Sequence, residues 1–194
     1  MTTRWTKLLA TSSLSAAPWL SRRMTAEFDD RGVLRPATAG AMYATYGAHA
    51  AAYLAAVSRP SRRLPVPSSI AGPLGAGTAV LGTLLCGAGM NRFTGAGQVS
   101  GTTTGPFVTA GAYRYTRNPQ YTGYILALCG VAFARRSLAG LALAAAAAGA
   151  FAWWVPVEER HLLREFGAEY QGYLDHTPRW LGLTPRSLPA DGSV

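Results

Sequence analysis

Charged residues in this sequence are confined to short clusters, and long uncharged stretches separate the clusters. No formally charged residue lies between Arg35 and Arg59, or between Arg63 and Arg92. Only 14% of the residues are charged, whereas about a quarter is usual in a soluble domain. A membrane-spanning helix needs about 20 apolar residues, because the hydrocarbon core of a bilayer is about 30 Å thick. The segregation of charge therefore predicts a polytopic membrane protein.

Four apolar segments are long enough, or nearly long enough, to cross a bilayer as helices. Residues 37–57 and 70–90 predict the first two, residues 121–134 a shorter third, and residues 138–157 a full-length fourth. Only three residues separate the third segment from the fourth, so these two are expected to form a tight hairpin. We expect an all-α fold with about four transmembrane helices.

The distribution of basic residues predicts the orientation of these helices. One side carries six basic residues before the first segment, three in the loop 91–120 and four after the fourth segment, thirteen in all. The other side carries five. Basic residues are enriched in cytoplasmic loops, so we expect the termini and the long loop to face the cytoplasm from the cell membrane. Arg135 and Arg136 fit this orientation poorly, which a third segment that does not fully cross would explain.

Beyond Pro156 the apolar pattern changes to that of an amphipathic helix. The residues expected on its apolar face are Leu162, Leu163, Phe166, Tyr170, Tyr173 and Leu174. Pro178 is expected to end this cytoplasmic helix. The predicted organisation is a cytoplasmic N-terminal segment, two transmembrane helices, a core of loop, hairpin and amphipathic helix, and a flexible tail. These parts are residues 1–36, 37–90, 91–181 and 182–194.

The net charge of +9 comes almost wholly from arginine. A nucleic-acid-binding protein gathers such residues on one face or arm, whereas here they stand at the ends of apolar runs. This placement favours contact with membrane lipids and predicts no nucleic-acid partner. Cys86 and Cys129 lie inside apolar runs without metal-ligand spacing, as is typical of small buried residues. We therefore expect no metal site.

Two polar clusters flank the predicted hairpin on the same side of the membrane. They comprise residues 105–123 and residues 158–161, and the hairpin brings them together. They supply aromatic rings, amides and two carboxylates, Glu158 and Glu159. These are the groups that a sulfonium nucleoside would need. A carboxylate can accept hydrogen bonds from its ribose hydroxyls or pair with its amino group, and a tyrosine ring attracts its sulfonium cation. Other roles remain open, because glutamates also suit the first turn of a helix after proline and tyrosines an interfacial belt.

Three motifs resemble the isoprenylcysteine carboxyl methyltransferase and phospholipid methyltransferase family. They are Gly111-Ala-Tyr-Arg-Tyr-Thr-Arg-Asn-Pro-Gln-Tyr-Thr-Gly123, then Glu158-Glu159, then Phe166-Gly167-Ala168-Glu169-Tyr170 with Tyr173. The resemblance covers roughly residues 98–181. It implies an integral membrane enzyme that uses S-adenosylmethionine, held in the C-terminal half between a helical hairpin and the following helix.

By that resemblance, residues from three segments form the cofactor site. They are Gln98, Gly105, Pro106, Phe107, Val108, Tyr113, Asn118, Pro119, Gln120, Tyr121 and Glu158. Arg117 and Glu159 are candidates for positioning roles, and no catalytic residue is assigned. The family usually has histidine where this chain has Asn118. Asparagine also donates and accepts hydrogen bonds, so we expect cofactor binding to be retained.

Trp153 and Trp154 precede the two glutamates and predict either the wall of an acceptor tunnel or an interfacial anchor. The prenylcysteine enzymes carry arginine at the position of Trp154, which argues here against a carboxylate substrate. We expect methyl transfer from S-adenosylmethionine to a lipophilic small molecule that is isoprenoid, prenylcysteine-like or phospholipid-like. The alternatives are a soluble thiol or amine acceptor, and a non-enzymatic membrane scaffold that retains a relic site.

Overall fold

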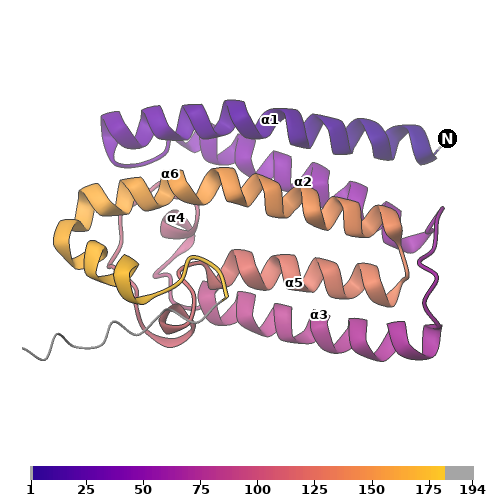
Figure 1. Ribbon diagram of the computed structural model, residues 1–194. Helices are drawn as coiled ribbons and strands as arrows, with labels where there is room; N and C mark the ends of the chain where they lie inside the picture. Colours follow the sequence, from indigo (N-terminus) through magenta and orange to yellow (C-terminus); the bar gives the residue numbers. More distant parts are fainter. Residues whose placement is uncertain (1, 182–194) are drawn as a thin grey trace, which may run out of the picture.

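The computed structural model describes residues 2–181, in which the regular elements are all helices, as the sequence predicted. Five long helices lie side by side in a bundle (Figure 1). They are α1 (Thr2–Arg31), α2 (Pro36–Ser58), α3 (Ser68–Met90), α5 (Pro119–Ala134) and α6 (Leu138–His176). The loop between α3 and α5 carries two short helices, α4 (Ala96–Val99) and η1 (Gly111–Arg114). The tail predicted for residues 182–194 lies outside the described residues.

Two of the long helices, α3 and α6, are long and apolar enough to cross a membrane. α3 leaves Leu74, Leu81 and Leu84 exposed, which suits contact with lipid chains. α2 and α5 form at the segments expected for the first and third spans, but α5 has only 16 residues. The four-span arrangement therefore stays a prediction.

α3 and α5 lie side by side (Figure 1) and pack against each other through glycines. Gly75, Gly82 and Gly89 recur every seventh residue on α3. Gly75 meets Gly130 and Gly82 meets Gly123 on α5, and Gly89 lies against the start of α5. A Cβ atom at Gly75 or Gly82 would lie 2.4 Å from a backbone nitrogen of α5, and one at Gly123 would lie 2.3 Å from a backbone nitrogen of α3. The two backbones are thus in direct contact, which only small residues allow. We call this contact the glycine seam.

Side chains of the turn between α5 and α6 cap the neighbouring end of α2. The Ser137 hydroxyl accepts a hydrogen bond from the backbone N–H of Gly140 at 3.0 Å and donates to a carbonyl near the end of α2 at 2.9 Å. Arg135 donates to the last two carbonyls of α2, and Arg136 donates to the Leu64 carbonyl. Of the two arginines that fit the predicted orientation poorly, Arg135 therefore satisfies helix-end carbonyls, which otherwise lack partners, and Arg136 satisfies a carbonyl of the loop between α2 and α3.

α6 is longer than the sequence predicted, because it continues through Pro156 instead of beginning anew there. Its interruption lies at Gly167, where φ is 53°, a left-handed value that suits glycine. At about 1.5 Å per residue, the apolar residues 138–157 cover about 30 Å, the thickness of a hydrocarbon core. The residues predicted as an amphipathic helix lie in the distal part of α6, which ends at His176, before Pro178; their amphipathic character stays a prediction.

α1 lies along α2 and α6 (Figure 1). Its Leu20 and Met24 side chains are buried in one apolar cluster with Trp154 of α6. The Glu27 carboxylate accepts hydrogen bonds from the Thr38 hydroxyl at 2.7 Å and from a backbone N–H just before α2 at 2.8 Å. The N-terminal segment is therefore packed onto the bundle at the level where the apolar part of α6 ends.

Candidate functional site

A cavity of about 300 Å³ lies where α1, α2 and α6 meet the loop between α3 and α5. Ten of the eleven residues predicted for the cofactor site line it. They are Gln98, Gly105, Pro106, Phe107, Val108, Tyr113, Asn118, Gln120, Tyr121 and Glu158. The eleventh, Pro119, is fully buried at the first position of α5. The two polar clusters of the sequence do meet in space.

Glu158 is the first residue of α6 beyond its apolar run. Its Oε1 accepts a hydrogen bond from the Tyr121 hydroxyl at 2.7 Å. Burial raises the pKa of the Glu158 carboxyl to about 7, and the neighbouring Glu159 adds to the rise while the Tyr121 hydrogen bond opposes it. A cation bound beside this carboxyl would favour its ionised form.

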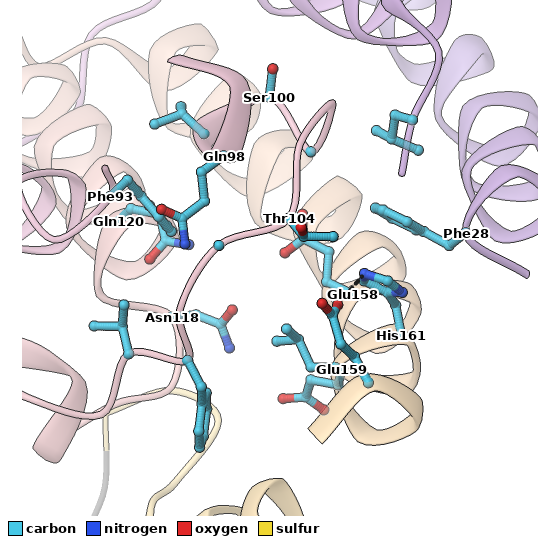
Figure 2. Close-up of a pocket in the computed structure, with 18 of the residues that line it drawn as sticks. Phe28, Phe93, Gln98, Ser100, Thr104, Asn118, Gln120, Glu158, Glu159 and His161 are labelled. Atoms are coloured by element: carbon cyan, nitrogen blue, oxygen red, sulfur yellow. Dashed lines mark ion pairs between the residues drawn. The ribbon is translucent and has the colours of Figure 1, made fainter. Parts of the chain in front are cut away.

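Hydrogen bonds fix the polar side chains that face Glu158 from the loop. The Tyr113 hydroxyl donates to Gln120 Oε1 at 3.0 Å. Asn118 Nδ2 donates to the Arg179 carbonyl at 3.1 Å. In Figure 2 the Asn118 side chain points across the cavity toward the glutamates of α6. These amides and rings are therefore held in place on the side of the cavity opposite α6.

The loop before η1 is shaped by one amide side chain, that of Gln98. Its Oε1 accepts from the Thr94 backbone N–H at 2.9 Å, and its Nε2 donates to the Pro106 carbonyl at 3.3 Å. A Cβ atom at Gly105 would lie 2.3 Å from the Gln98 amide, so a larger residue here would displace that side chain. Phe107 then contacts three rings of α6, those of Phe166, Tyr170 and Tyr173.

Glu159 lies between two guanidinium groups. Arg117 Nε is 3.3 Å from Glu159 Oε1, and Arg179 donates to Glu159 through Nε at 3.0 Å and Nη2 at 2.6 Å. The Glu159 carboxylate raises the pKa of Arg179 through these hydrogen bonds. The Arg117 backbone N–H also donates to the Pro178 carbonyl at 2.9 Å. Glu159 and Arg117 therefore hold the loop and the segment after α6 together, and the sequence carried no signal for Arg179.

The remaining wall of the cavity comes from α1 and α2, and the sequence did not predict it. We call this wall the N-terminal lobe; it comprises Met24, Phe28, Met42, Tyr43 and Tyr46. The Phe28 ring stacks on the imidazole of His161, with centroids 4.2 Å apart. Figure 2 shows the two side chains next to each other. The four-residue spacing of apolar residues in the N-terminal segment is the sequence pattern that could have predicted a helix packing at this wall.

Neither tryptophan of the predicted acceptor site lines the cavity. Trp153 is 62% exposed on the outer face of α6. Trp154 is only 2% exposed and stacks on Tyr46 with centroids 5.8 Å apart. Its side chain also helps to lower the pKa of Glu158, which does line the cavity. The role of both tryptophans in binding an acceptor stays a prediction.

The sequence model of the phospholipid methyltransferase family matches residues 71–169, which run from α3 to the distal part of α6. This match covers about half of the chain and most residues of the cavity, whereas the N-terminal lobe precedes it. No curated protein and no solved structure matches the chain. The resemblance found in the sequence is confirmed, and the chain belongs to the phospholipid methyltransferase family.

Proposed function

We propose that this protein is an integral membrane methyltransferase that transfers a methyl group from S-adenosylmethionine to a lipophilic small molecule. The observation that carries the proposal is the Glu158 carboxyl, which lines the cavity where the apolar part of α6 ends and accepts a hydrogen bond from the Tyr121 hydroxyl. Membership of a methyltransferase family supports the reaction class.

The residues of the cavity suit the charge of this cofactor. S-adenosylmethionine carries two cationic groups, a sulfonium and an ammonium, and one carboxylate. Glu159 is paired with Arg117 and Arg179, whereas Glu158 has no basic partner among the described residues. Glu158 is therefore the carboxylate that can accept from a cationic or hydroxyl group. A cavity of about 300 Å³ lies at the lower end of the range for small-molecule sites.

The bound cofactor would supply a methyl group on a positively charged sulfur. The chain's own contribution is to orient the two reactants and to exclude water, and correct orientation alone lowers a barrier by several kcal/mol. Tyr121 and Tyr113 are hydrogen-bonded on the cavity wall and present rings that attract a cation. Gln98 and Gly105 keep the loop close against this wall.

Isotope-labelled S-adenosylmethionine, added with a total lipid extract to the purified protein in detergent, tests the proposal. We expect label to appear in the lipid fraction, because the cavity adjoins the apolar part of α6. Label in a soluble thiol or amine would favour the alternative acceptor class. A protein that neither binds the cofactor nor transfers label to either fraction would behave as a scaffold and contradict the proposal.

A further inference from the structure

The N-terminal lobe forms the apolar part of the cavity. Next to it, α6 carries two polar side chains, those of His161 and Glu165. His161 Nε2 lies 3.1 Å from Glu165 Oε2, one turn further along the helix. Stacking against Phe28, with the rings 11° from parallel, fixes the plane of the imidazole. Both His161 and Glu165 line the cavity. The pair therefore stands at the boundary between the lobe and the rest of the site.

The pair shares a helix face with the proposed cofactor carboxylate. Glu158, His161 and Glu165 are spaced three and four residues apart, and residues at this spacing are neighbours on the surface of a helix. In Figure 2 Glu158 and His161 lie on the same side of the cavity, below Phe28. A group that contacts His161 is thus adjacent to a ligand held at Glu158.

The surroundings of His161 keep its imidazole neutral at neutral pH. Burial lowers the pKa of His161; Glu165 and Asp29 raise it, and Arg164 lowers it. Arg164 and Asp29 form an ion pair with each other, so their effects largely offset. A neutral imidazole whose Nε2–H donates to the Glu165 carboxylate has Nδ1 as its hydrogen-bond acceptor. Such an imidazole can take up a proton.

The charges around the cavity disfavour an acceptor that carries a carboxylate. Among the described residues that line it, Arg117 is the only arginine or lysine, and its guanidinium pairs with Glu159. Glu158 and Glu165 add negative charge on the α6 face. A second carboxylate would be repelled, whereas a neutral or cationic head group would not.

We propose that the N-terminal lobe holds the apolar body of the methyl acceptor and that the His161–Glu165 pair takes the proton from its head group, an amine, hydroxyl or thiol. This inference rests on the proposed function. The acceptor's nucleophilic atom gives its proton to His161 Nδ1 and bonds to the methyl carbon. The carbon–sulfur bond breaks, and its electron pair stays on sulfur. The Glu165 carboxylate stabilises the imidazolium until water removes the proton.

Four probes that share a dodecyl chain test the proposal with labelled S-adenosylmethionine: dodecylamine, a dodecyl-substituted phenol, dodecanethiol and dodecanoate. The wild-type protein should methylate at least one of the three protic probes and leave dodecanoate unlabelled. H161Q should lower kcat for the protic probe by about 10²- to 10⁴-fold, the usual contribution of a general base, without changing cofactor affinity. With a difluorinated phenol, which ionises more readily, the loss should be smaller. E165Q should also lower kcat and shift the pH profile.

His176→Gln is the matched control, because His176 is exposed in the last turn of α6 and does not line the cavity. H176Q should keep wild-type turnover. A binding readout needs no cofactor: the isotope-labelled imidazole nitrogens of His161 should shift in NMR spectra when the dodecyl phenol is added, and those of His176 should not.

Several outcomes would overturn the inference while leaving the proposed function intact. They are methylation of dodecanoate as fast as the protic probes, wild-type turnover by H161Q, or cofactor binding without methylation of any probe. Absence of S-adenosylmethionine binding by the wild-type protein would instead overturn the proposed function itself. If H161Q does not fold, E165Q and the probe preference of the wild-type protein decide the matter.

Discussion

Glu158 and Glu159 are neighbours in the sequence, yet the fold gives them different surroundings. Glu159 is held by two guanidinium groups, whereas Glu158 faces the cavity with a phenol hydroxyl. The sequence predicted that both carboxylates would meet the loop before α5. It could not predict which one is neutralised, because Arg179 lies 20 residues further on and turns back only after α6 has ended.

Replacing Glu158 by glutamine removes the charge and nearly keeps the shape. If this carboxylate contacts the cofactor, affinity for S-adenosylmethionine should fall by about 1.5–3 kcal/mol, the range for hydrogen bonds to charged groups. Titration calorimetry measures the change. Glu169→Gln, an exposed position on the same helix outside the cavity, is the control and should bind as the wild type does. If all three proteins bind S-adenosylmethionine with equal affinity, Glu158 does not contact the cofactor and has only a structural role in the helix.

Cofactor affinity should also depend on pH near neutrality. The Glu158 carboxyl has a pKa of about 7, so it is mostly neutral below that pH and mostly ionised above it. A cationic ligand prefers the ionised form, so its affinity should weaken as the pH falls through about 7 and level off above. Calorimetry across this range should show the trend in the wild type and a flatter one in E158Q. If affinity depends on pH equally in both proteins, a group other than Glu158 causes the dependence.

At the scale of elements, the glycine seam predicts that glycine-to-alanine substitutions on α3 change the stability of the protein in opposite directions, depending on which face of the helix they lie on. A Cβ atom at Gly82 would collide with the α5 backbone, whereas one at Gly77 has nothing within 4 Å. Gly82→Ala should therefore destabilise the protein by about 1–3 kcal/mol, as overpacking does. Gly77→Ala should stabilise it by about 0.5–1 kcal/mol, because alanine favours a helix. Thermal unfolding in detergent compares the two, and equal shifts would argue against the seam.

The helices that the sequence predicted well are those bounded by charge. Residues 70–90 and 121–134 were expected, and α3 and α5 begin only two residues earlier. Residues 1–36 were predicted only as a cytoplasmic segment, with no helix assigned there, because the polar composition of α1 hides a face that is buried only by packing on α2 and α6. From the sequence, Arg135 and Arg136 were interpreted only as markers of membrane orientation. Their role as hydrogen-bond donors could not be predicted, because the carbonyls that accept from them lie far away in the sequence.

At the scale of the whole molecule, the basic residues predict where the ends of the bundle lie. Single cysteines at Ser61 and Ser193, in a background without Cys86 and Cys129, report this through labelling with a membrane-impermeant reagent. Ser61 should react from outside the cell and Ser193 only after the membrane is opened, since thirteen basic residues lie on the side of the termini and five on the other. Reaction of both from the same side would rule out four spans.

The sequence predicted that the loop before α5 and the start of distal α6 would meet, because a tight hairpin forces their contact. It did not predict that α1 and α2 would close the cavity. That closure depends on contacts such as Phe28 with His161, between generic side chains far apart in the sequence. The N-terminal lobe, which precedes the family match, was therefore the part of the site that motifs could not reveal.

The glycine seam is a contact between backbones and the N-terminal lobe a contact between side chains, so the two differ in how many substitutions they tolerate. Backbone lies directly against backbone in the seam, so a new side chain there has no room. The lobe is made of methionine, phenylalanine and tyrosine side chains, which can be exchanged for others of similar volume at modest cost. If the lobe holds the acceptor as proposed, substitutions in the first two helices can change the acceptor range, in evolution or by engineering, while the scaffold beneath them stays the same.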